Sequence, residues 1–372
     1  DEKVAAARSV DGKLIASPRT RDSGRYGLSD RQDWAEAVGI TEEPKTVDDV
    51  YEMMYKFTYE DPDGNGEDDT FGMEMTQYTG PFDIIQTWFG VGNGWAEVDG
   101  ELIPVHMQKE YKEALDWLKK VYDEGLMPQD WAVRTTDTWS EGCKTGESGM
   151  YVDVMDGGRR IWDYFVKDET YTPSVVNPDE PASMNLLGPI NDKTLATQGY
   201  NGFFTLSAST LDSEEKIEAA LQLLDRLNDN EARLLCEYGL EGIHWEKSDE
   251  GYLVDLDTDK PELSNNYAGL NQMLAYLPRV DIQPPTEKTE RNIAQEEAYK
   301  RNEEYAVFNP ALAYLVGSET YADVGATLAE IVSQARTQYI CGEIDEAGLE
   351  SAHQQWLDQG GQQIIEEVNS QR

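Results

Sequence analysis

The sequence predicts an α/β fold with two domains. At 372 residues, the chain is longer than one hydrophobic core ordinarily supports. Short apolar or alternating runs typical of strands are separated by amphipathic stretches of helical period, which is the pattern of an α/β architecture. Nine Trp, 20 Tyr and 8 Phe supply bulky core material, although hydrophobic residues make up only 39% of the chain. We therefore expect a folded protein with a very polar surface.

The first expected element is a short apolar strand in 12–19 (GKLIASPR), which Pro18 is expected to end. Residues 29–39 (SDRQDWAEAVG) predict a helix with Gly39 at its C-cap. A second helix is expected over 46–58 (TVDDVYEMMYKFT), because its first residue, Thr46, is a natural N-cap and apolar residues then recur at helical spacing.

The later elements complete the α/β pattern. In one of them, Asp212 and Glu215 predict a cap-and-box arrangement at the start of a helix. The sequence predicts an amphipathic helix at 110–128, a strand that turns into a loop at 147–158 and an extended apolar stretch at 199–209. The capped helix follows at 211–229, and residues 286–372 are expected to be almost entirely helical. No internal repeat or low-complexity linker interrupts them.

The charge is the strongest compositional signal. The chain has 73 Asp and Glu against 31 Lys and Arg, a formal charge of −42. Such a surface repels phosphate backbones, so we expect no nucleic-acid partner, and it disfavours docking flat on an anionic membrane. No apolar run approaches the roughly 18 residues of a membrane helix. The opening DEKVAAARSVDGK is not a signal peptide, which leaves open a targeting sequence removed upstream or a cytoplasmic chain.

Motifs for catalysis are missing from the sequence. The cysteines Cys143, Cys236 and Cys341 are widely spaced without a CxxC pair, and we interpret them as isolated small hydrophobes. There is no HExxH, GxSxG or GxxxxGK[ST] motif, and GVGNG at 90–94 reads as a turn. Glycoside hydrolysis needs two carboxylates about 5–10 Å apart, and nothing in the linear sequence marks such a pair.

An acidic loop, DPDGNGEDDTFG at 61–72, resembles part of a calcium loop. Oxygen-bearing residues fall at every second position, as in the first nine places of an EF-hand: Asp61, Asp63, Asn65, Glu67 and Asp69. Gly66 stands at the sixth place, which needs a sharp turn, but Gly72 stands where an EF-hand supplies a bidentate Glu. The spacing favours Ca²⁺ binding, and an ion-free polar turn is the alternative.

Aromatic residues raise a second possibility. Several lie beside Gly, Pro or polar loop residues rather than in helix interiors: Tyr26, Tyr78, Phe82, Trp88, Tyr151, Trp162, Tyr200 and Trp245. Rings that stack on a sugar, with carboxylates or amides bonding its hydroxyls, form a typical polar-ligand site. For each residue the alternative is plain core or interdomain packing. As a group, we expect them to include several ligand contacts.

Segments along the whole chain, taken in order, resemble family 1 of the extracellular solute-binding proteins of bacterial ABC importers. The likeness is greatest to the large lipoprotein branch that includes alginate- and oligosaccharide-binding members. It rests on GKLIASPR, DRQDWAEAVGITEEPKTVDDVYEMMYKF, DPDGNGEDDTFG, NGW (93–95), YDEGLMPQDW (122–131), KTGESGMY (144–151), GLEGIHW (239–245) and WLDQGGQQIIEEVN (356–369).

The resemblance implies a periplasmic-binding-protein-like (type II) fold, in which two α/β domains are joined by a multi-strand hinge. The expected N-terminal lobe comprises 1–17 and 210–275, the C-terminal lobe 18–209 and 286–372, and the third hinge crossing 276–285. In the family, the opening strands and helices of the first domain and a lipobox cysteine precede this stretch, so the chain is expected to be either a fragment or an unusually reduced member.

By the same resemblance, the function is capture of a solute, usually a sugar or oligosaccharide, in an interdomain cleft and its delivery to an ABC permease, without chemistry. Closure would be a population shift driven by the ligand. The protein is expected to be a monomeric, extracellular, cell-surface lipoprotein, held at the membrane only by an upstream lipid anchor. A polysaccharide hydrolase or lyase with a structural calcium, and a receptor for peptides or other non-sugar solutes, are the alternatives.

The resemblance also implies site residues. The Tyr78–Phe82 stretch and the loop after Tyr151 would line the cleft. In the family this loop is aromatic-rich, whereas VDVMDGGRR here is not, which indicates a polar or charged ligand. The expected ligand-binding set is Tyr26, Tyr78, Phe82, Tyr151, Asp153, Asp156, Arg159, Trp162, Asn201, Glu241, His244 and Trp245. The loop at 61–69 matches a structural Ca²⁺ loop of the alginate-binding relatives, with Thr70 in place of a following carboxylate.

Overall fold

The computed structural model describes residues 14–256, 260–275 and 282–372. By its internal contacts the chain divides into two compact units. Unit 1 comprises the residues up to Arg21 together with Gln198–Glu290, and unit 2 comprises Asp22–Thr197 and Arg291–Arg372. The lobe boundaries expected from the resemblance remain a prediction, and most of the expected third crossing, residues 276–281, lies outside the described residues.

Unit 2 is built on a four-stranded sheet. Its strands, in the order β3–β6–β2–β7, are Phe71–Met73, Ser148–Val154, Tyr26–Arg31 and Met184–Leu187. β3 runs parallel to β6, and β2 runs antiparallel to both β6 and β7. Successive side chains of a strand point to opposite faces, so Met150 and Val152 contribute to one core and Tyr151 to the other.

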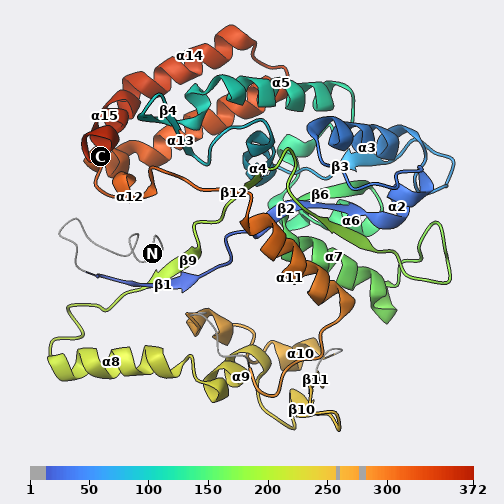
Figure 1. Cartoon of the computed structure of the whole chain (residues 1–372), viewed down its shortest axis with the longest axis vertical. Helices are drawn as coiled ribbons and strands as arrows, with labels where there is room; N and C mark the ends of the chain where they lie inside the picture. Colours follow the sequence, from blue (N-terminus) through green and yellow to red (C-terminus); the bar gives the residue numbers. More distant parts are fainter. Residues whose placement is uncertain (1–13, 257–259, 276–281) are drawn as a thin grey trace. The chain divides into compact units, whose positions relative to one another are not determined.

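Helices cover both faces of this sheet (Figure 1). On one face lie α3 (Val47–Tyr59) and α4 (Gly80–Trp88), and on the other α6 (Glu141–Thr145) and α7 (Met155–Val166). The strands are therefore buried from both sides, as the α/β prediction requires.

The start of α3 confirms the cap that the sequence predicts. The Thr46 hydroxyl accepts a hydrogen bond from the Asp49 backbone N–H (3.2 Å), and the Asp49 carboxylate accepts one from the Thr46 N–H (2.9 Å). This reciprocal capping box satisfies two N–H groups that the helix leaves unpaired. Val50 and Phe57 then face the core.

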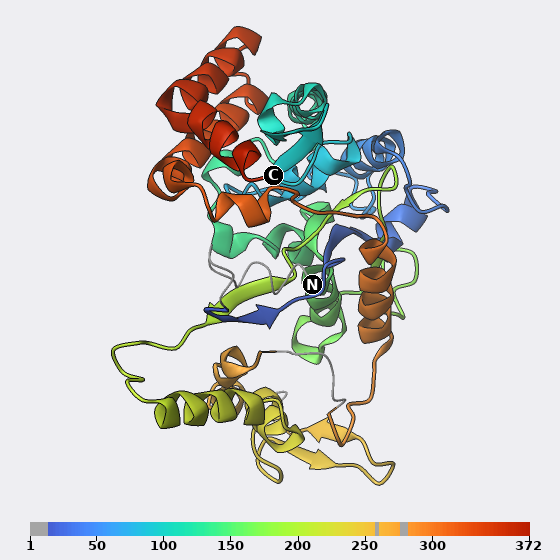
Figure 2. The same cartoon turned by 60° about the vertical axis from the view of Figure 1, so that its left-hand side comes forward.

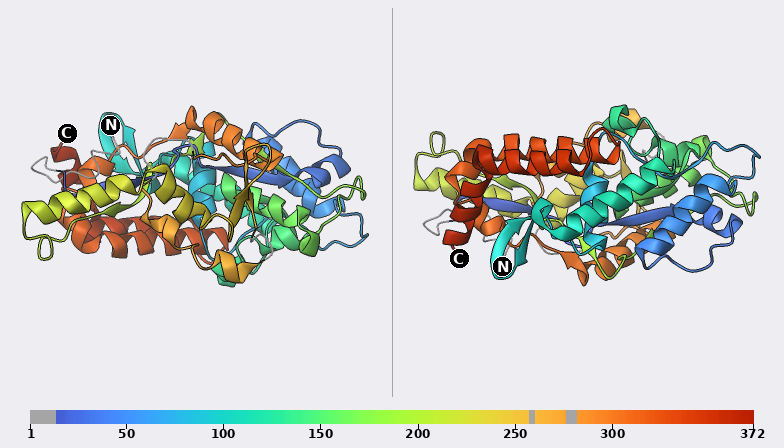
Figure 3. Two further views of the ribbon diagram at one scale, coloured as in Figure 1. Left: turned by 90° about the horizontal axis from the view of Figure 1, so that it is seen from below. Right: turned by 90° about the horizontal axis from the view of Figure 1, so that it is seen from above.

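The C-terminal helices form a second layer of unit 2. α13 (Glu319–Ile340) packs against both α5 (Lys109–Asp123) and α14 (Glu346–Trp356), and Figure 3 shows these helices side by side. The remaining elements assigned mainly to unit 2 are α2 (Gln32–Ala37), β4 (Trp95–Val98), β5 (Glu101–Pro104), β8 (Thr194–Leu195), α11 (Glu290–Glu303), β12 (Ala306–Val307), α12 (Leu312–Leu315) and α15 (Gln362–Ser370).

Unit 1 contains two antiparallel strand pairs. β1 (Ser17–Thr20) pairs with β9 (Tyr200–Phe204), as Figure 2 shows, and β10 (Trp245–Lys247) pairs with β11 (Leu253–Asp255). Its helices are α8 (Glu214–Arg226), α9 (Asn230–Tyr238) and α10 (Pro261–Ser264). None of the helices in the described ranges has both the length and the apolar composition to cross a membrane.

One sequence expectation for unit 1 is wrong. The cap of α8 is Ser213, whose hydroxyl accepts a hydrogen bond from the Lys216 N–H (3.3 Å), rather than Asp212. The Asp212 carboxylate instead pairs with the Lys216 ammonium at 2.7 Å. Asp212 lies one residue before the cap, where its carboxylate can pair with Lys216. The sequence pattern did not show which of the two residues, Asp212 or Ser213, caps the helix.

Two buried carboxyl groups of unit 2, Asp30 and Glu74, have strongly raised pKa values. Asp30 on β2 is fully buried and accepts one hydrogen bond, from the Asn185 amide at 3.2 Å, while its Oδ1 has no partner. Glu74, just after β3, is also buried, 4.0 Å from the Arg134 guanidinium. Burial raises the pKa of each carboxyl to about 7.

The raised pKa values of Asp30 and Glu74 predict that the free energy of unfolding falls as the pH rises. Their folded pKa values of about 7 exceed the ordinary values of 3.8 and 4.5. The folded state therefore binds more protons between about pH 4 and 7, and the associated stability is lost as the pH rises through 7. Thermal unfolding should show that the isosteric Asp30→Asn variant loses less stability than the unsubstituted protein between pH 5 and pH 8. An unchanged difference between the two proteins across this range would contradict the assignment.

Candidate functional site

An aromatic cluster surrounds a buried carboxylate at one edge of the sheet in unit 2. β3 and β6 are parallel, so both end at this edge, and the antiparallel β2 begins there. The topology therefore brings together Tyr26 at the start of β2, Tyr78 in the segment after β3, and Asp153 near the end of β6. Edges where parallel strands end are the usual ligand-binding positions of α/β sheets.

Trp139 is the centre of this cluster, although its sequence context did not predict it as a ligand contact. Its ring lies 5.6 Å from that of Tyr78, edge to face, and 5.1 Å from that of Tyr151. The Trp139 indole Nε1–H donates to Asp153 Oδ2 at 2.6 Å, and the Tyr151 hydroxyl donates to the same oxygen at 3.3 Å. We define the aromatic cluster as Tyr26, Tyr78, Trp139, Tyr151 and Asp153.

The electrostatics keep the phenols of the cluster neutral. Burial, and after it the charge of Asp153, raises the pKa of Tyr26, Tyr78 and Tyr151. Burial also raises the pKa of Asp153, against the hydrogen bonds from Trp139 and Tyr151, which favour its charged form. The cluster thus offers ring faces, neutral hydroxyl groups and one carboxylate, the groups suited to holding a sugar.

Two glycines explain the unusual sequence after β6. A Cβ at Gly157 would lie 2.6 Å from the Tyr151 ring, and a Cβ at Gly158 would lie 2.2 Å from the Ser29 hydroxyl. Only glycine allows α7 to pack this closely on β6 and β2. The two glycines of VDVMDGGRR are therefore explained by packing of the first turn of α7.

Asp156 and Arg159 tie α7 to its surroundings. Burial alone would raise the pKa of Asp156, but hydrogen bonds from Arg25 (2.7 and 2.8 Å) and the Tyr299 hydroxyl (2.8 Å) hold it well below its ordinary value. The Arg159 guanidinium donates to the Gln295 amide oxygen at 2.6 Å and pairs with Asp163. Both side chains are engaged within unit 2 in this structure, so a solute would have to compete with these partners.

Phe82 and Trp162, expected as ligand contacts, pack against hydrophobic cores. Phe82 is 1% exposed and meets the Trp131 ring edge to face at 5.2 Å. Trp162, on α7, is half-buried beside the core that includes Phe165. In this conformation the Phe82 ring presents no surface to a solute. In the sequence, the position of Phe82 within the apolar helical pattern of α4 is equally consistent with a core residue and with a ligand contact.

A pocket of about 480 Å³ adjoins the aromatic cluster. Trp139 and Tyr151 belong to both. We call it the basic pocket; the residues that line it are Trp139, Ser140, Lys144, Tyr151, Gly157, Arg160, Asp163, Tyr164, Lys167 and Thr170. Of these residues, only Tyr151 was predicted from the sequence as a ligand contact, because nothing in a single sequence shows that α6 and α7 face one another.

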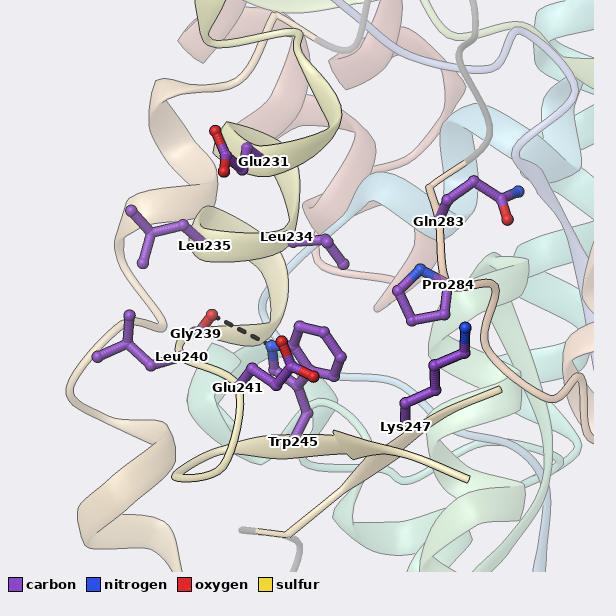
Figure 4. Close-up of a pocket in the computed structure, with 10 residues that line it drawn as sticks. All are labelled: Glu231, Leu234, Leu235, Gly239, Leu240, Glu241, Trp245, Lys247, Gln283 and Pro284. Atoms are coloured by element: carbon purple, nitrogen blue, oxygen red, sulfur yellow. Dashed lines mark hydrogen bonds between the residues drawn. The ribbon is translucent and has the colours of Figure 1, made fainter. Parts of the chain in front are cut away.

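Unit 1 has a pocket of its own, of about 580 Å³ (Figure 4). Trp245 on β10 forms part of its wall, and the Trp245 indole N–H donates to the Gly239 carbonyl oxygen at 3.3 Å. Leu234 and Leu235 of α9 supply apolar wall, and Glu241 lies beside the indole. The pocket therefore brings together Glu241 and Trp245 of the expected set.

His244 lies behind this pocket rather than in its lining. Its Nδ1 accepts a hydrogen bond from the Leu240 N–H (2.9 Å), and its ring packs against that of Tyr267 at 4.8 Å. The side chain is buried and holds the turn between α9 and β10. Asn201, the remaining expected residue of unit 1, is exposed on β9.

The acidic loop after α3 gathers its oxygens around an amide. The Asn65 side-chain NH₂ donates to Asp63 Oδ2 (2.9 Å) and lies 3.2 and 3.3 Å from the two carboxylate oxygens of Asp69. The Asp61 carboxylate accepts from the Gly66 N–H through Oδ2 (3.1 Å), while its buried Oδ1 accepts no hydrogen bond. Gly66 has φ +83°, as the sharp turn of the pattern requires.

The fit to a cation is partial. Burial raises the pKa of Asp63, and the hydrogen bond to Asp61 and the charges of Asp69 and Asp61 raise it further. Within the described ranges, no three His, Cys, Asp or Glu side chains are arranged as a metal site. The Thr70 hydroxyl points away from the loop and donates to the Phe57 carbonyl oxygen at 2.7 Å. The residues that remain to hold a cation are those expected: Asp61, Asp63, Asn65, Glu67 and Asp69.

Two curated bacterial proteins are similar in sequence to nearly the whole chain. The lipoprotein LipO of Bacillus subtilis is 34% identical over 374 residues, covering 99% of this chain and 73% of LipO. The polygalacturonan/rhamnogalacturonan-binding protein YtcQ of the same organism is 28% identical over 366 residues, covering 96% of this chain and 70% of YtcQ. No family model matches the chain.

Solved structures with the same fold are solute-binding proteins. An HMO-binding, ABC-transporter-associated solute-binding protein of Bifidobacterium longum infantis superposes with a TM-score of 0.68 at 18% identity, covering 99% of this chain and 78% of that one. FusA of Streptococcus pneumoniae, in complex with kestose, has a TM-score of 0.69 at 15% identity and covers 98% and 77%. The predicted periplasmic-binding-protein-like fold is confirmed.

The chain belongs to the extracellular solute-binding proteins of ABC importers. Its relatives are binding proteins rather than enzymes, so the prediction of non-enzymatic solute binding is confirmed. Two structures of the same fold concern calcium: the alginate-binding protein AlgQ2 without calcium ion, with a TM-score of 0.68 at 14% identity, and a FusA EF-hand mutant, with a TM-score of 0.66 at 16% identity.

Proposed function

We propose that this protein captures an oligosaccharide outside the cell and delivers it to the permease of an ABC importer. The observation that carries the proposal is the aromatic cluster, in which Trp139 and Tyr151 lie 5.1 Å apart around the Asp153 carboxylate. The curated relative YtcQ is named for binding polygalacturonan and rhamnogalacturonan, and FusA for fructooligosaccharides. Those names support a saccharide ligand for this chain.

The groups of the cluster have distinct roles in this proposal. The ring faces of Tyr78 and Trp139 would stack on the apolar faces of sugar rings. Asp153, whose Oδ2 already accepts from Trp139 and Tyr151, would accept from a sugar hydroxyl through its other oxygen. Tyr26, a neutral phenol near the same carboxylate, would donate to or accept from a second hydroxyl.

The unit 1 pocket supplies a second contact surface of the same chemistry. Trp245 provides an indole face held by its bond to the Gly239 carbonyl, and the Glu241 carboxylate lies beside it. Asn201, exposed on β9, adds an amide that can bond a sugar hydroxyl. These residues retain the ligand-binding roles that the resemblance implies.

We further propose that the protein acts as a monomer, held at the cell surface by a lipid attached upstream of the sequence described here. The name of LipO as a lipoprotein supports the anchor. A formal charge of −42 disfavours direct docking on an anionic membrane, which makes a lipid anchor the more suitable attachment.

A thermal-shift screen with neutral and acidic oligosaccharides tests the proposed function. A ligand at 100 times its Kd should stabilise the protein by about 2.7 kcal/mol and raise its Tm. Chromatography should then recover the stabilising sugar unchanged. If only peptides raise the Tm, or if the sugar is shortened, the receptor for an oligosaccharide is the wrong assignment.

We also propose that the loop at 61–69 binds Ca²⁺ as a structural brace. Asp61, Asp63, Asn65 and Asp69 would hold the ion with the Glu67 carbonyl, and the ion would supply a positive charge where the neutral Asn65 amide now donates hydrogen bonds to Asp63 and Asp69. The buried Asp61 Oδ1, which accepts no hydrogen bond, supports this proposal.

Calcium is expected to stabilise the fold without changing what it binds. Adding CaCl₂ at about 1 mM to chelator-treated protein should raise the Tm, because the ion binds the folded loop and relieves repulsion between the Asp61, Asp63 and Asp69 carboxylates. Asp63→Asn should reduce that shift, and Lys109→Gln, on the distant exposed start of α5, should not. An unchanged Tm would leave the loop an ion-free turn. Loss of solute binding without loss of stability would place the ion at the solute site instead.

A further inference from the structure

The basic pocket concentrates positive charge in a strongly acidic protein. Three of its ten lining residues are cations, Lys144, Arg160 and Lys167, and one is an acid, Asp163. The whole chain has 31 basic against 73 acidic residues. We propose that this pocket binds a carboxylate-bearing sugar unit, so that the solute is an acidic oligosaccharide. The inference rests on the proposed function and specifies its substrate class.

Two acids beside the pocket, Asp156 and Asp163, are each shared by two arginines. Asp156 accepts from Arg160 at 2.6 Å but is also the bidentate partner of Arg25, so one carboxylate serves two guanidiniums. Asp163 is paired in the same way with two arginines outside the lining, Arg159 and Arg291. Each group of one acid and two arginines has a net positive charge.

Arg160 is the cation best placed for a carboxylate. Its side chain is 57% exposed, and its bond to Asp156 runs through one terminal nitrogen, NH1. A guanidinium has five N–H donors in a planar fork that matches a carboxylate in a bidentate arrangement. Arg160 therefore has donors beyond those given to Asp156.

Lys144 lies across the pocket from α7, at the end of α6. Its ammonium pairs with Glu141 at 2.9 Å and lies 5.6 Å from the centre of the Tyr164 ring. Glu141 is more exposed than Lys144, 53% against 22%, so the acid lies on the solvent side of this pair. Lys144 thus contributes its charge to a pocket whose walls include the rings of Trp139 and Tyr164.

The combination of rings and cations selects the chemistry of the ligand. A volume of about 480 Å³ suits a small sugar unit. Ring faces stack on its apolar face, and the cations recognise a carboxylate on its edge. The chain has a formal net charge of −42, so its surface would repel a long polyanion such as nucleic acid. An oligosaccharide with a few carboxylates carries much less charge and is repelled much less.

Isothermal titration with trigalacturonate and its fully methyl-esterified form tests this inference, because the two probes share size and ring chemistry and differ in charge. Trigalacturonate should bind at least about tenfold more tightly than its ester, and the difference should shrink as NaCl is raised. Inorganic phosphate should compete weakly, since it lacks the sugar ring.

Variants assign the effect to the pocket. Lys144→Gln and Arg160→Gln should each lower the affinity for trigalacturonate about three- to tenfold and leave that for the ester within about twofold. Lys109→Gln, which removes an exposed cation paired with Glu113 on α5, is the matched control and should change neither. Thermal unfolding of each variant shows whether it folds.

The outcomes separate the two proposals. If the ester binds as tightly as the acid, if the variants weaken both probes equally, or if phosphate displaces trigalacturonate stoichiometrically, the basic pocket is not a carboxylate-sugar site. If neutral oligosaccharides bind and acidic ones do not, this inference fails and the proposed function stands. If no oligosaccharide binds, the proposed function fails as well.

Discussion

Trp139→Ala should lower the affinity for the bound oligosaccharide about 100-fold, the largest effect on binding that we expect. The substitution removes the ring that lies 5.6 Å from Tyr78 and 5.1 Å from Tyr151, and with it the stacking surface shared by the aromatic cluster and the basic pocket. It also leaves Asp153 without its 2.6 Å indole donor. Buried aromatic anchors of this kind typically contribute about 2–4 kcal/mol to binding.

Two companion variants make this result interpretable. Trp139→Phe keeps a ring but lacks the N–H, so its affinity should lie between those of the unsubstituted protein and Trp139→Ala. Trp117→Phe changes a half-buried tryptophan on α5, whose ring packs against Phe89 at 5.9 Å, and should leave binding unchanged. Equal affinity of Trp139→Ala and the unsubstituted protein for a defined oligosaccharide would remove the aromatic cluster from the site.

Gly72→Ala should destabilise unit 2 by about 2–3 kcal/mol, a large effect for one methyl group. Gly72 lies on β3, and a Cβ there would come 2.6 Å from the Met54 Cα and 2.7 Å from its carbonyl oxygen on α3. Backbone atoms of a packed helix cannot move aside as a flexible side chain can, so α3 and β3 must separate.

Gly269→Ala is the matched control for this substitution. Nothing lies within 4 Å of a Cβ at Gly269, and its φ of −80° suits any residue. It should therefore be neutral or slightly stabilising, by up to about 1 kcal/mol. Chemical denaturation of both variants measures the difference. If Gly72→Ala were as stable as Gly269→Ala, the close approach of α3 to β3 would be wrong.

Local signals in the sequence predicted much of the fold. Thr46 caps α3, and the apolar spacing over 46–58 matches the buried face of that helix. The sequence pattern was ambiguous at proline, which can either end a strand or occupy an edge strand. Pro18 was expected to end the first strand, yet it lies inside β1 opposite Phe203. An edge position in a two-stranded sheet tolerates its missing N–H.

The candidate site was only partly predictable. Tyr151 and Asp153 stand two residues apart on β6, so strand alternation places them on one face. Tyr26 pairs with Val154 and so starts β2 at the same end of the sheet, on the opposite face. Trp139 escaped notice because it comes from a polar segment, TTDTWSEG, whose position over the sheet depends on long-range packing. Phe82 looked equivalent to the other aromatics, but α4 turns it into the core.

The acidic loop shows how a motif departs from its pattern for structural reasons. An EF-hand would place a Glu where Gly72 stands, but α3 passes too close to β3 for any Cβ at that position. Thr70, expected in place of a further ligand, instead bonds the Phe57 carbonyl near the end of α3. Both departures serve the packing of α3, so the truncated set of oxygens is what this fold can supply to an ion.

The central claim is that the aromatic cluster holds an oligosaccharide and leaves it intact. The most direct measurement is isothermal titration of the protein with a purified oligosaccharide identified by thermal shift, followed by chromatography of the recovered sugar. We predict one sugar bound per chain, about 100-fold weaker binding by Trp139→Ala, and a sugar of unchanged length. Binding that survives Trp139→Ala undiminished, or a sugar recovered in shorter pieces, would contradict the account.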